Sequence, residues 1–292
     1  MITRRTVRTC AAAFLAATSA LTAALAAGPS ALAAPPSVYV AMGDSYAAGP
    51  LILPMTDPVT CVRSALNYAH LLAQQLHVTT LRDVTCSSAT TQNFANPQPG
   101  SVSGTAPPQY NALRSDTTLV TVGIGGNDVG LVGLAESCIN VFPPPIGKSC
   151  AAKYTAGGVD QYSQRIQAFA PTFGTVIDRI HQLAPNARVL MVGYPTAIRN
   201  GGCFPYQPLL GPDATYIQAK IDELNSVMAQ QAAAHNATYV NIRTSSVGHD
   251  SCALPGIRWL EGLVPTSDSF PLHPNQLEMR NTTKVINGIL SH

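Results

Sequence analysis

Short apolar runs alternate along the chain with longer segments in which apolar residues recur every three or four positions. Such runs are typical of buried strands, and the longer segments are typical of helices with one buried face. We predict strands over residues 37–42, 119–124, 188–192 and 238–242, and helices over residues 63–76, 161–183, 214–235 and 274–290. We expect Pro171 to kink the second of these helices. Strands that alternate with helices predict an α/β fold, a three-layer α/β/α sandwich with a central parallel sheet.

Residues 1–33 have the pattern of a secretory signal peptide. Three arginines within the first eight residues precede a stretch rich in Ala and Leu, and Ala-Leu-Ala at residues 31–33 supplies a small-x-small cleavage pattern. A membrane-spanning helix is the alternative, but the stretch is short for a bilayer and contains mostly Ala. We therefore predict cleavage near Ala33 or Ala34, secretion, and a single domain over residues 35–292.

Cysteine and charge usage agree with an exported protein. Only 11% of the residues are charged, the formal net charge is +2, and no Lys/Arg cluster follows the leader, so nucleic acid is excluded as a partner.

Six cysteines remain after the leader, an even number that indicates up to three disulfides in an oxidising compartment. Pairing in chain order closes the shortest loops and is the arrangement we expect: Cys61–Cys86, Cys138–Cys150 and Cys203–Cys252. The cysteines and histidines lack the spacing of metal ligands, so we predict no metal and no cofactor.

Three candidate catalytic residues stand next to the predicted strands and the last helix. Gly43-Asp44-Ser45 follows the first strand and Gly125-Gly126-Asn127 follows the second. Carboxyl ends of parallel strands meet at one sheet edge, where ligands bind. A serine there can act as nucleophile, the Asn127 amide can donate to a developing oxyanion, and His273 can act as general base. Each segment alone also fits an ordinary turn or surface site; together they predict a serine hydrolase.

These motifs resemble those of a known family. GDSY at residue 43, CSSATT at residue 86, GGND at residue 125 and HPN at residue 273 resemble, in this order, the SGNH or GDSL hydrolases. The six cysteines look most like the secreted Streptomyces-type esterases and lipases of that family, and the resemblance spans residues 37–292. It implies a flavodoxin-like α/β/α sandwich and ester hydrolysis through an acyl-enzyme on Ser45.

Two positions depart from the family pattern. Ser88 stands where the family has an oxyanion-hole glycine; it keeps the backbone N–H but is strained if φ is positive. Phe270 stands three residues before His273, where many relatives carry an aspartate that orients the imidazole. Resemblance to the Streptomyces-type enzymes implies a main-chain carbonyl in this role. We expect the carbonyl of Phe270, with the carboxylate of Asp268 as the alternative.

The substrate class follows less directly from the sequence. Apolar residues over 51–54, and Leu131, Val132 and Leu134, are candidate walls of an acyl-chain pocket. We expect a monomer that acts on lipid-like or short-to-medium acyl esters, with transient contact at a lipid interface. The alternatives are an esterase that deacetylates polysaccharides or other glycans, and a non-catalytic secreted binding protein of the same fold. The chain lacks the GxSxG and HExxH motifs of rival hydrolases.

Overall fold

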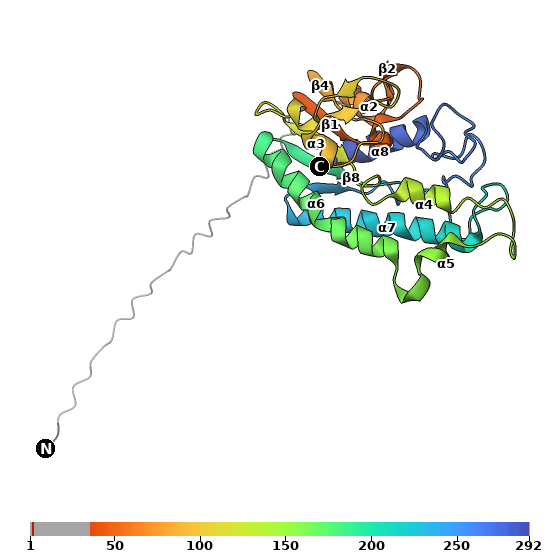
Figure 1. The fold of residues 1–292 in the computed structure, drawn as a ribbon. Coiled ribbons are helices and arrows are strands. Elements are labelled where there is room, and N and C mark those ends of the chain that lie inside the picture. Colours follow the sequence, from red (N-terminus) through yellow and green to blue (C-terminus); the bar gives the residue numbers. More distant parts are fainter. Residues whose placement is uncertain (1, 3–35, 292) are drawn as a thin grey trace. The chain divides into compact units, whose positions relative to one another are not determined.

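The computed structural model describes residue 2 and residues 36–291 (Figure 1). The predicted signal peptide and its cleavage site lie outside these residues, apart from Ile2. From residue 36 onward the described chain forms one compact unit. Within the described part, no helix has the length and apolarity needed to cross a bilayer.

A five-stranded parallel sheet forms the middle layer of this unit, in the order β4-β1-β7-β8-β9. Its strands are β1 (Val38–Gly43), β4 (Thr80–Asp83), β7 (Leu119–Gly123), β8 (Arg188–Val192) and β9 (Thr238–Val240). The sheet confirms the predicted fold class and four of its strands. Edge strand β4 was not predicted, because its four half-buried residues lack an apolar run.

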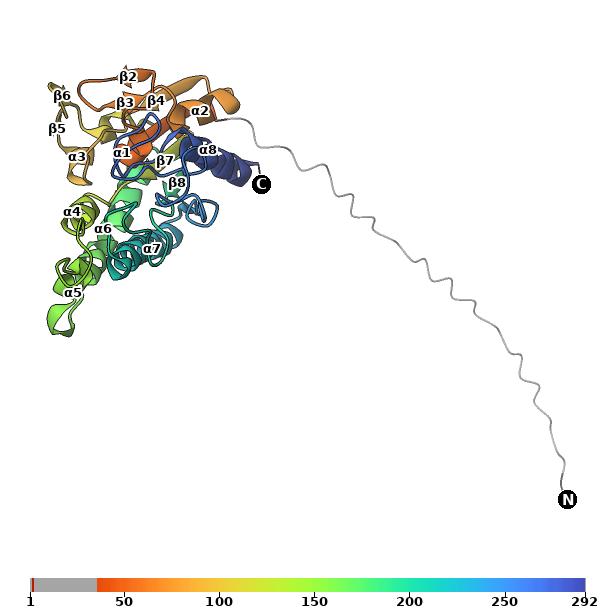
Figure 2. The same cartoon turned by 90° about the vertical axis from the view of Figure 1, so that its right-hand side faces the viewer.

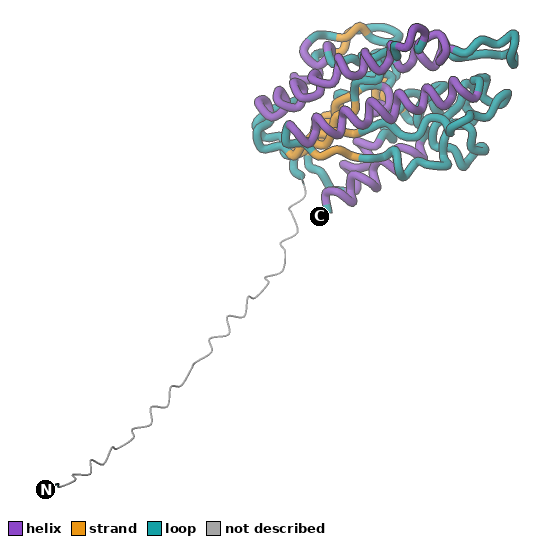
Figure 3. Tube along the Cα trace, turned by 90° about the horizontal axis from the view of Figure 1, so that it is seen from below, coloured by secondary structure: helices purple, strands orange, loops and turns teal. Residues whose placement is uncertain are grey.

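Helices cover both faces of the sheet, as Figures 1 and 2 show. Helices α2 (Tyr68–Gln75) and α8 (Gln276–Leu290) lie on one face, and α6 (Gln161–Leu183) and α7 (Gly211–Ala234) lie on the other. Seen from below, the long helices lie in front of the strands and cover them (Figure 3). Successive residues of β1 point to opposite cores, so both faces of the strand are buried.

The remaining elements are short and lie mostly in the loops at the carboxyl edge of the sheet. They are α1 (Ser45–Ala48), β2 (Met55–Asp57), β3 (Arg63–Ser64), α3 (Gln92–Ala95), β5 (Gln98–Pro99), β6 (Thr105–Ala106), η1 (Gln109–Ala112), α4 (Leu131–Ser137), α5 (Cys150–Tyr154) and η2 (Ala156–Gly158). Three disulfides stabilise these loops and join the six cysteines in the expected order, Cys61–Cys86, Cys138–Cys150 and Cys203–Cys252.

All four predicted helices are present, and three of them, α2, α7 and α8, begin at other residues than predicted. Helix α2 begins at Tyr68 rather than at residue 63, because Arg63 and Ser64 pair with β2 and the Asn67 side chain then caps the helix at the His70 N–H (3.1 Å). Helix α6 has the predicted bounds and runs through Pro171 as one element.

A buried carboxyl on α8 has few compensating contacts. Glu278 is 1% exposed, and its Oε1 accepts hydrogen bonds from Asn281 Nδ2 (3.0 Å) and Thr282 Oγ1 (3.2 Å). Its Oε2 has no partner among the described residues. Burial raises the pKa of Glu278 to about 8, so the folded protein holds this carboxyl protonated at neutral pH.

Glu278 is expected to make the protein less stable as pH rises. Between the ordinary glutamate pKa of 4.5 and about 8, the folded state binds one more proton here than the unfolded state. The free energy of unfolding therefore falls with rising pH across that window. Glu278→Gln should flatten part of this slope and be more stable than the parent near the upper end, as measured by urea unfolding across the window. The exposed Glu136→Gln is the control; a slope in Glu278→Gln equal to the parent's would contradict the assignment.

Candidate active site

Ser45 lies at the carboxyl end of β1, on a turn that only glycine permits. A Cβ on Gly43, whose φ is +148°, would lie 2.3 Å from the carbonyl oxygen of Gly123 on the neighbouring strand. The side-chain amide of Gln109 accepts from the Gly43 N–H (2.8 Å) and donates to its carbonyl (2.9 Å). Asp44 then caps α1 by accepting the Tyr46 N–H (2.9 Å). Backbone and side-chain contacts therefore fix the position of the Ser45 hydroxyl.

His273 reaches this hydroxyl from a loop more than 200 residues further along the chain. Its Nε2 lies 2.8 Å from Ser45 Oγ, and its Nδ1 lies 2.8 Å from the carbonyl oxygen of Pro271. A carbonyl can only accept, so Nδ1 carries the proton and Nε2 accepts the Ser45 O–H. Burial lowers the pKa of His273 below its ordinary 6.5, against the opposing effect of the Pro271 bond. The imidazole is therefore neutral, and able to take a proton, at neutral pH.

The prediction of the Phe270 carbonyl is wrong by one residue. The Phe270 carbonyl accepts the backbone N–H of His273 (3.2 Å), which closes a turn containing Leu272 at φ +62°. That turn directs the Pro271 carbonyl, rather than that of Phe270, toward Nδ1. Asp268 is exposed and makes no hydrogen bond with the ring. The side chain of Phe270 instead packs edge-on to the His273 ring, with centroids 5.3 Å apart.

The histidine loop is held by a buried carboxylate that sequence reasoning missed. The Glu261 N–H donates to the His273 carbonyl (3.0 Å), and Glu261 Oε1 accepts from Asn275 Nδ2 (2.8 Å). Arg258 lies 3.6 Å from the other carboxylate oxygen. Arg258 is three residues before Glu261 and Asn275 is 14 residues after it, and together they form no recognisable motif, so no sequence signal identifies Glu261.

The loop after Cys86 and the GGND turn are tied together by side chains. Asn127 Nδ2 donates to the Ala89 carbonyl (2.9 Å). Asp128 Oδ1 accepts both the backbone N–H (3.0 Å) and the hydroxyl (2.7 Å) of Thr91. An amide carries two donor hydrogens, so Asn127 keeps one for a ligand.

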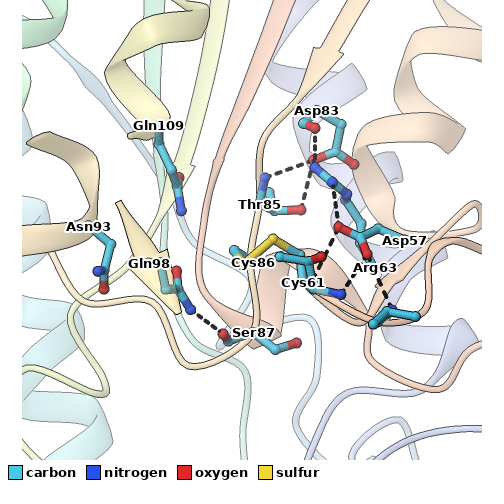
Figure 4. Close-up of a disulfide and its surroundings, with 12 residues drawn as sticks. Asp57, Cys61, Arg63, Asp83, Thr85, Cys86, Ser87, Asn93, Gln98 and Gln109 are labelled. Atoms are coloured by element: carbon cyan, nitrogen blue, oxygen red, sulfur yellow. Dashed lines mark hydrogen bonds and ion pairs between the residues drawn. A yellow bond between two sulfur atoms is a disulfide. The ribbon is translucent and has the colours of Figure 1, made fainter. Parts of the chain in front are cut away.

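Ser88 adopts the left-handed conformation for which the family uses glycine, with φ +67°. Its loop is anchored by the Cys61–Cys86 disulfide and by Gln98 Nε2, which donates to the Ser87 carbonyl (2.6 Å), as Figure 4 shows. Among the described residues, neither the Ser88 N–H nor the Ser45 N–H donates to another protein group. Both N–H groups therefore remain available to an oxyanion.

Tyr194, just after β8, is a second residue that sequence reasoning missed. Its hydroxyl donates to Asp44 Oδ2 (2.7 Å) and accepts the Gly126 N–H (2.8 Å). Burial raises the pKa of Asp44 to about 7, and the bond from Tyr194 opposes that rise.

A cavity of about 280 Å³ opens beside these groups, and Ser45, Asn127 and His273 lie in its wall. Ser88 is exposed and is not part of that wall. Most of the other lining residues are apolar: Leu131, Val132, Ala135, Ile139, Pro195, Ala197, Ile198, Leu209, Ile217, Ile221, Leu260, Leu263, Phe270, Pro271 and Leu272. Of the predicted acyl-pocket residues, Leu131 and Val132 line the cavity. Leu134 is in the core and residues 51–54 lie elsewhere, so those two expectations are wrong.

A serine hydroxyl bonded to a neutral imidazole, at the carboxyl edge of a parallel α/β sheet, defines a serine hydrolase with an apolar cavity. The chain belongs to the GDSL-like lipase/acylhydrolase family, whose sequence profile matches residues 41–277. This membership confirms the resemblance seen in the sequence motifs and identifies the protein as a carboxylic ester hydrolase.

Several Streptomyces proteins are similar to this chain. Lipase 2 of Streptomyces coelicolor is 36% identical over 249 residues, which cover 83% of this chain and 82% of that protein. Among solved structures, phospholipase A1 from Streptomyces albidoflavus matches with a TM-score of 0.67 at 27% identity, covering 87% of this chain and 99% of that one. The extracellular lipase from Streptomyces rimosus matches with a TM-score of 0.66 at 26% identity, covering 86% of this chain and 99% of that one.

The geometry around His273 leads to a test of the orienting group. If a carbonyl orients the ring, Asp268→Asn should lower kcat/KM less than about tenfold, or 1.4 kcal/mol of transition-state stabilisation. His273→Ala should lower it by several orders of magnitude, because the proton acceptor is lost. Both variants are assayed on a soluble p-nitrophenyl ester. A loss of about 10³ in folded Asp268→Asn would show that a carboxylate completes the triad after all.

Proposed function

We propose that this protein hydrolyses lipid-like carboxylic esters through an acyl-enzyme on Ser45. The observation that carries the proposal is the 2.8 Å contact between Ser45 Oγ and His273 Nε2 in the wall of an apolar cavity. Ser45 Oγ attacks the ester carbonyl while His273 Nε2 takes its proton. The imidazolium then returns that proton to the leaving alcohol, and a water molecule releases the acid by the same sequence of steps.

Three donors would stabilise the tetrahedral oxyanion in this mechanism. They are the backbone N–H groups of Ser45 and Ser88 and the second Nδ2 hydrogen of Asn127. The Pro271 carbonyl would orient His273 and support the imidazolium with a partial rather than a full negative charge. Burial keeps the imidazole neutral and so ready to take a proton at neutral pH, but it does not replace a carboxylate in stabilising the imidazolium.

The apolar cavity favours an acyl chain over a sugar as its occupant. A glycan-deacetylating enzyme needs polar groups around the sugar, whereas this lining is mostly aliphatic. Relatives described as lipases and as a phospholipase A1 support the same choice. The non-catalytic alternative has no support, because the nucleophile, the base and an amide donor are all present in one wall.

Ser45→Ala tests this function directly. The variant should lose hydrolysis across a chain-length series of p-nitrophenyl esters, and should lose labelling by a fluorophosphonate probe. Asn127→Ala should keep labelling but lose about 10² to 10³ in kcat, because one oxyanion donor is removed. We expect medium-chain esters to exceed acetate esters and acetylated xylan in kcat/KM. Undiminished labelling in Ser45→Ala, or a preference for acetylated xylan, would refute the corresponding part of the proposal.

We further propose that the mouth of the cavity contacts a lipid surface. Val132, Ile139 and Phe270 line the cavity and are still 42%, 38% and 48% exposed. Val264 is 76% exposed and follows Leu263, which also lines the cavity. We call Val132, Ile139, Val264 and Phe270 the apolar rim. Exposed apolar residues continuous with an acyl cavity fit a partner that is itself apolar.

Two matched substitutions test the apolar rim. Val264→Asp should lower activity on zwitterionic phospholipid vesicles roughly tenfold, because burying one valine contributes about 1.5 kcal/mol and a charge adds a further penalty. Its activity on a soluble short ester should stay within about twofold. Val102→Asp is the control, since Val102 is 74% exposed in the β5–β6 turn, far in sequence from the cavity residues. Equal vesicle activities for the two variants would exclude contact at the rim.

We also propose that the protein is secreted and that it acts as a monomer. The predicted signal peptide, the three disulfides and the similarity to an extracellular lipase support export. Each catalytic group comes from the same chain, so the proposed chemistry requires no second copy.

A further inference from the structure

The Tyr194 hydroxyl lies between the two turns that carry the nucleophile and the oxyanion donor. It donates to Asp44 Oδ2 (2.7 Å), next to Ser45, and accepts the N–H of Gly126 (2.8 Å), next to Asn127. One oxygen atom therefore links both turns through short, buried hydrogen bonds. Tyr194 itself is 5% exposed.

Tyr194 is held by its own backbone and by its ring. Asn225 on α7 accepts the Tyr194 N–H at Oδ1 (2.7 Å) and donates to its carbonyl from Nδ2 (2.9 Å). The ring packs edge-on to Tyr46, with centroids 5.2 Å apart. Tyr46 in turn donates to the Leu272 carbonyl (2.8 Å), in the loop that carries the catalytic histidine. All three loops of the site are thus connected to one anchored side chain.

The close approach of Tyr194 also explains the second glycine of the GGND motif. A Cβ on Gly126 would lie 3.0 Å from the Tyr194 hydroxyl oxygen, tighter than ordinary side-chain contacts. A larger residue would push the hydroxyl away from the Gly126 N–H or tilt the turn that carries Asn127. The geometry therefore favours glycine at this position when the tyrosine is present.

We propose that Tyr194 is a positioning residue of the esterase reaction, whose hydroxyl sets the separation between the Ser45 N–H and the Asn127 amide. Both donors must point to one oxyanion, and a misplacement of about 1 Å can cost about 10² in rate. Tyr194 also lines the cavity, but its hydroxyl is hydrogen-bonded to Asp44 and Gly126, so we assign its effect to these two residues. The inference rests on the proposed function, because it assigns Tyr194 a role in that chemistry.

Tyr194→Phe tests the proposal, because it keeps the ring and removes only the hydroxyl. We expect kcat on a soluble p-nitrophenyl ester to fall about 10- to 100-fold, with KM within about twofold. Affinity for a trifluoromethyl ketone that forms a tetrahedral adduct should fall by about the same factor as kcat/KM. A role in folding alone would lower stability and leave both quantities near the parent values.

Tyr39→Phe is the matched control. Tyr39 lies in β1 of the same sheet, is fully buried, and its hydroxyl makes a 2.7 Å bond with Thr121 Oγ1, away from the cavity wall. This variant should lose stability but keep kcat within about twofold. If Tyr194→Phe fails to fold, Asn225→Ala releases the Tyr194 backbone clamp instead and should show the same fall in kcat without a rise in KM.

Two outcomes separate this proposal from the proposed function. Equal kcat values for Tyr194→Phe and Tyr39→Phe, in an enzyme whose ester hydrolysis depends on Ser45, would overturn the positioning role alone. A parent enzyme that hydrolyses none of the esters would overturn the proposed function, and the role of Tyr194 with it.

Discussion

The parallel pairing of β1 with β7 is the contact on which the active site depends. It places Gly43 opposite Gly123, so that the two strands end side by side and their loops start from the same edge. The backbones approach so closely that a Cβ at Gly43 would overlap the Gly123 carbonyl. The turns that carry Ser45 and Asn127 therefore both begin at this pair of strand ends, and the later contacts adjust the separation between the two turns.

Buried polar groups then fix the loops that leave this edge. Asp44, Asp128 and Glu261 each accept at least two hydrogen bonds, and the donors to Asp44 and Asp128 include Tyr194 and Thr91 from distant segments. An unpaired polar group in such surroundings costs about 1–3 kcal/mol, so each of these bonds strongly disfavours other loop conformations. The same burial keeps His273 neutral and Asp44 close to its titration point at neutral pH. Burial of polar groups therefore both fixes the loop conformations and lowers the pKa of His273.

The cavity combines a small polar group with a mostly aliphatic lining. Ser45, Asn127 and His273 line it together with aliphatic side chains from α4, α7 and the loop before α8. Such a lining suits a substrate with one polar reacting group and a long apolar remainder. In the proposed lipid contact, a molecule leaving a lipid layer would first meet the exposed apolar rim.

The local periodicity of apolar residues was sufficient to predict the central strands and helices of the fold. Strand β8 and helix α6 have the predicted bounds, because a strand buried on both faces and a long amphipathic helix carry their burial pattern in consecutive residues. Ser45, Asn127 and His273 could be named as candidates because strand ends and short motifs mark them, and the structure brings them together in one cavity. Helix α2 begins five residues later than predicted, since the pairing of β2 with β3 overrides its apolar spacing.

Tertiary structure alone decided which groups complete the site. Whether the carbonyl of Phe270 or of Pro271 meets the imidazole depends on a turn of four residues, whose conformation no apolar pattern encodes. The role of Tyr194 depends on a hydroxyl 150 residues from Asp44 along the chain. Residues 51–54 and Leu131 looked equivalent as pocket walls in the sequence, yet only Leu131 lines the cavity. The sequence alone determined which segments are buried and which residues are chemically able to react. The distances between those residues are set by contacts between distant segments, because such contacts form only when the chain folds.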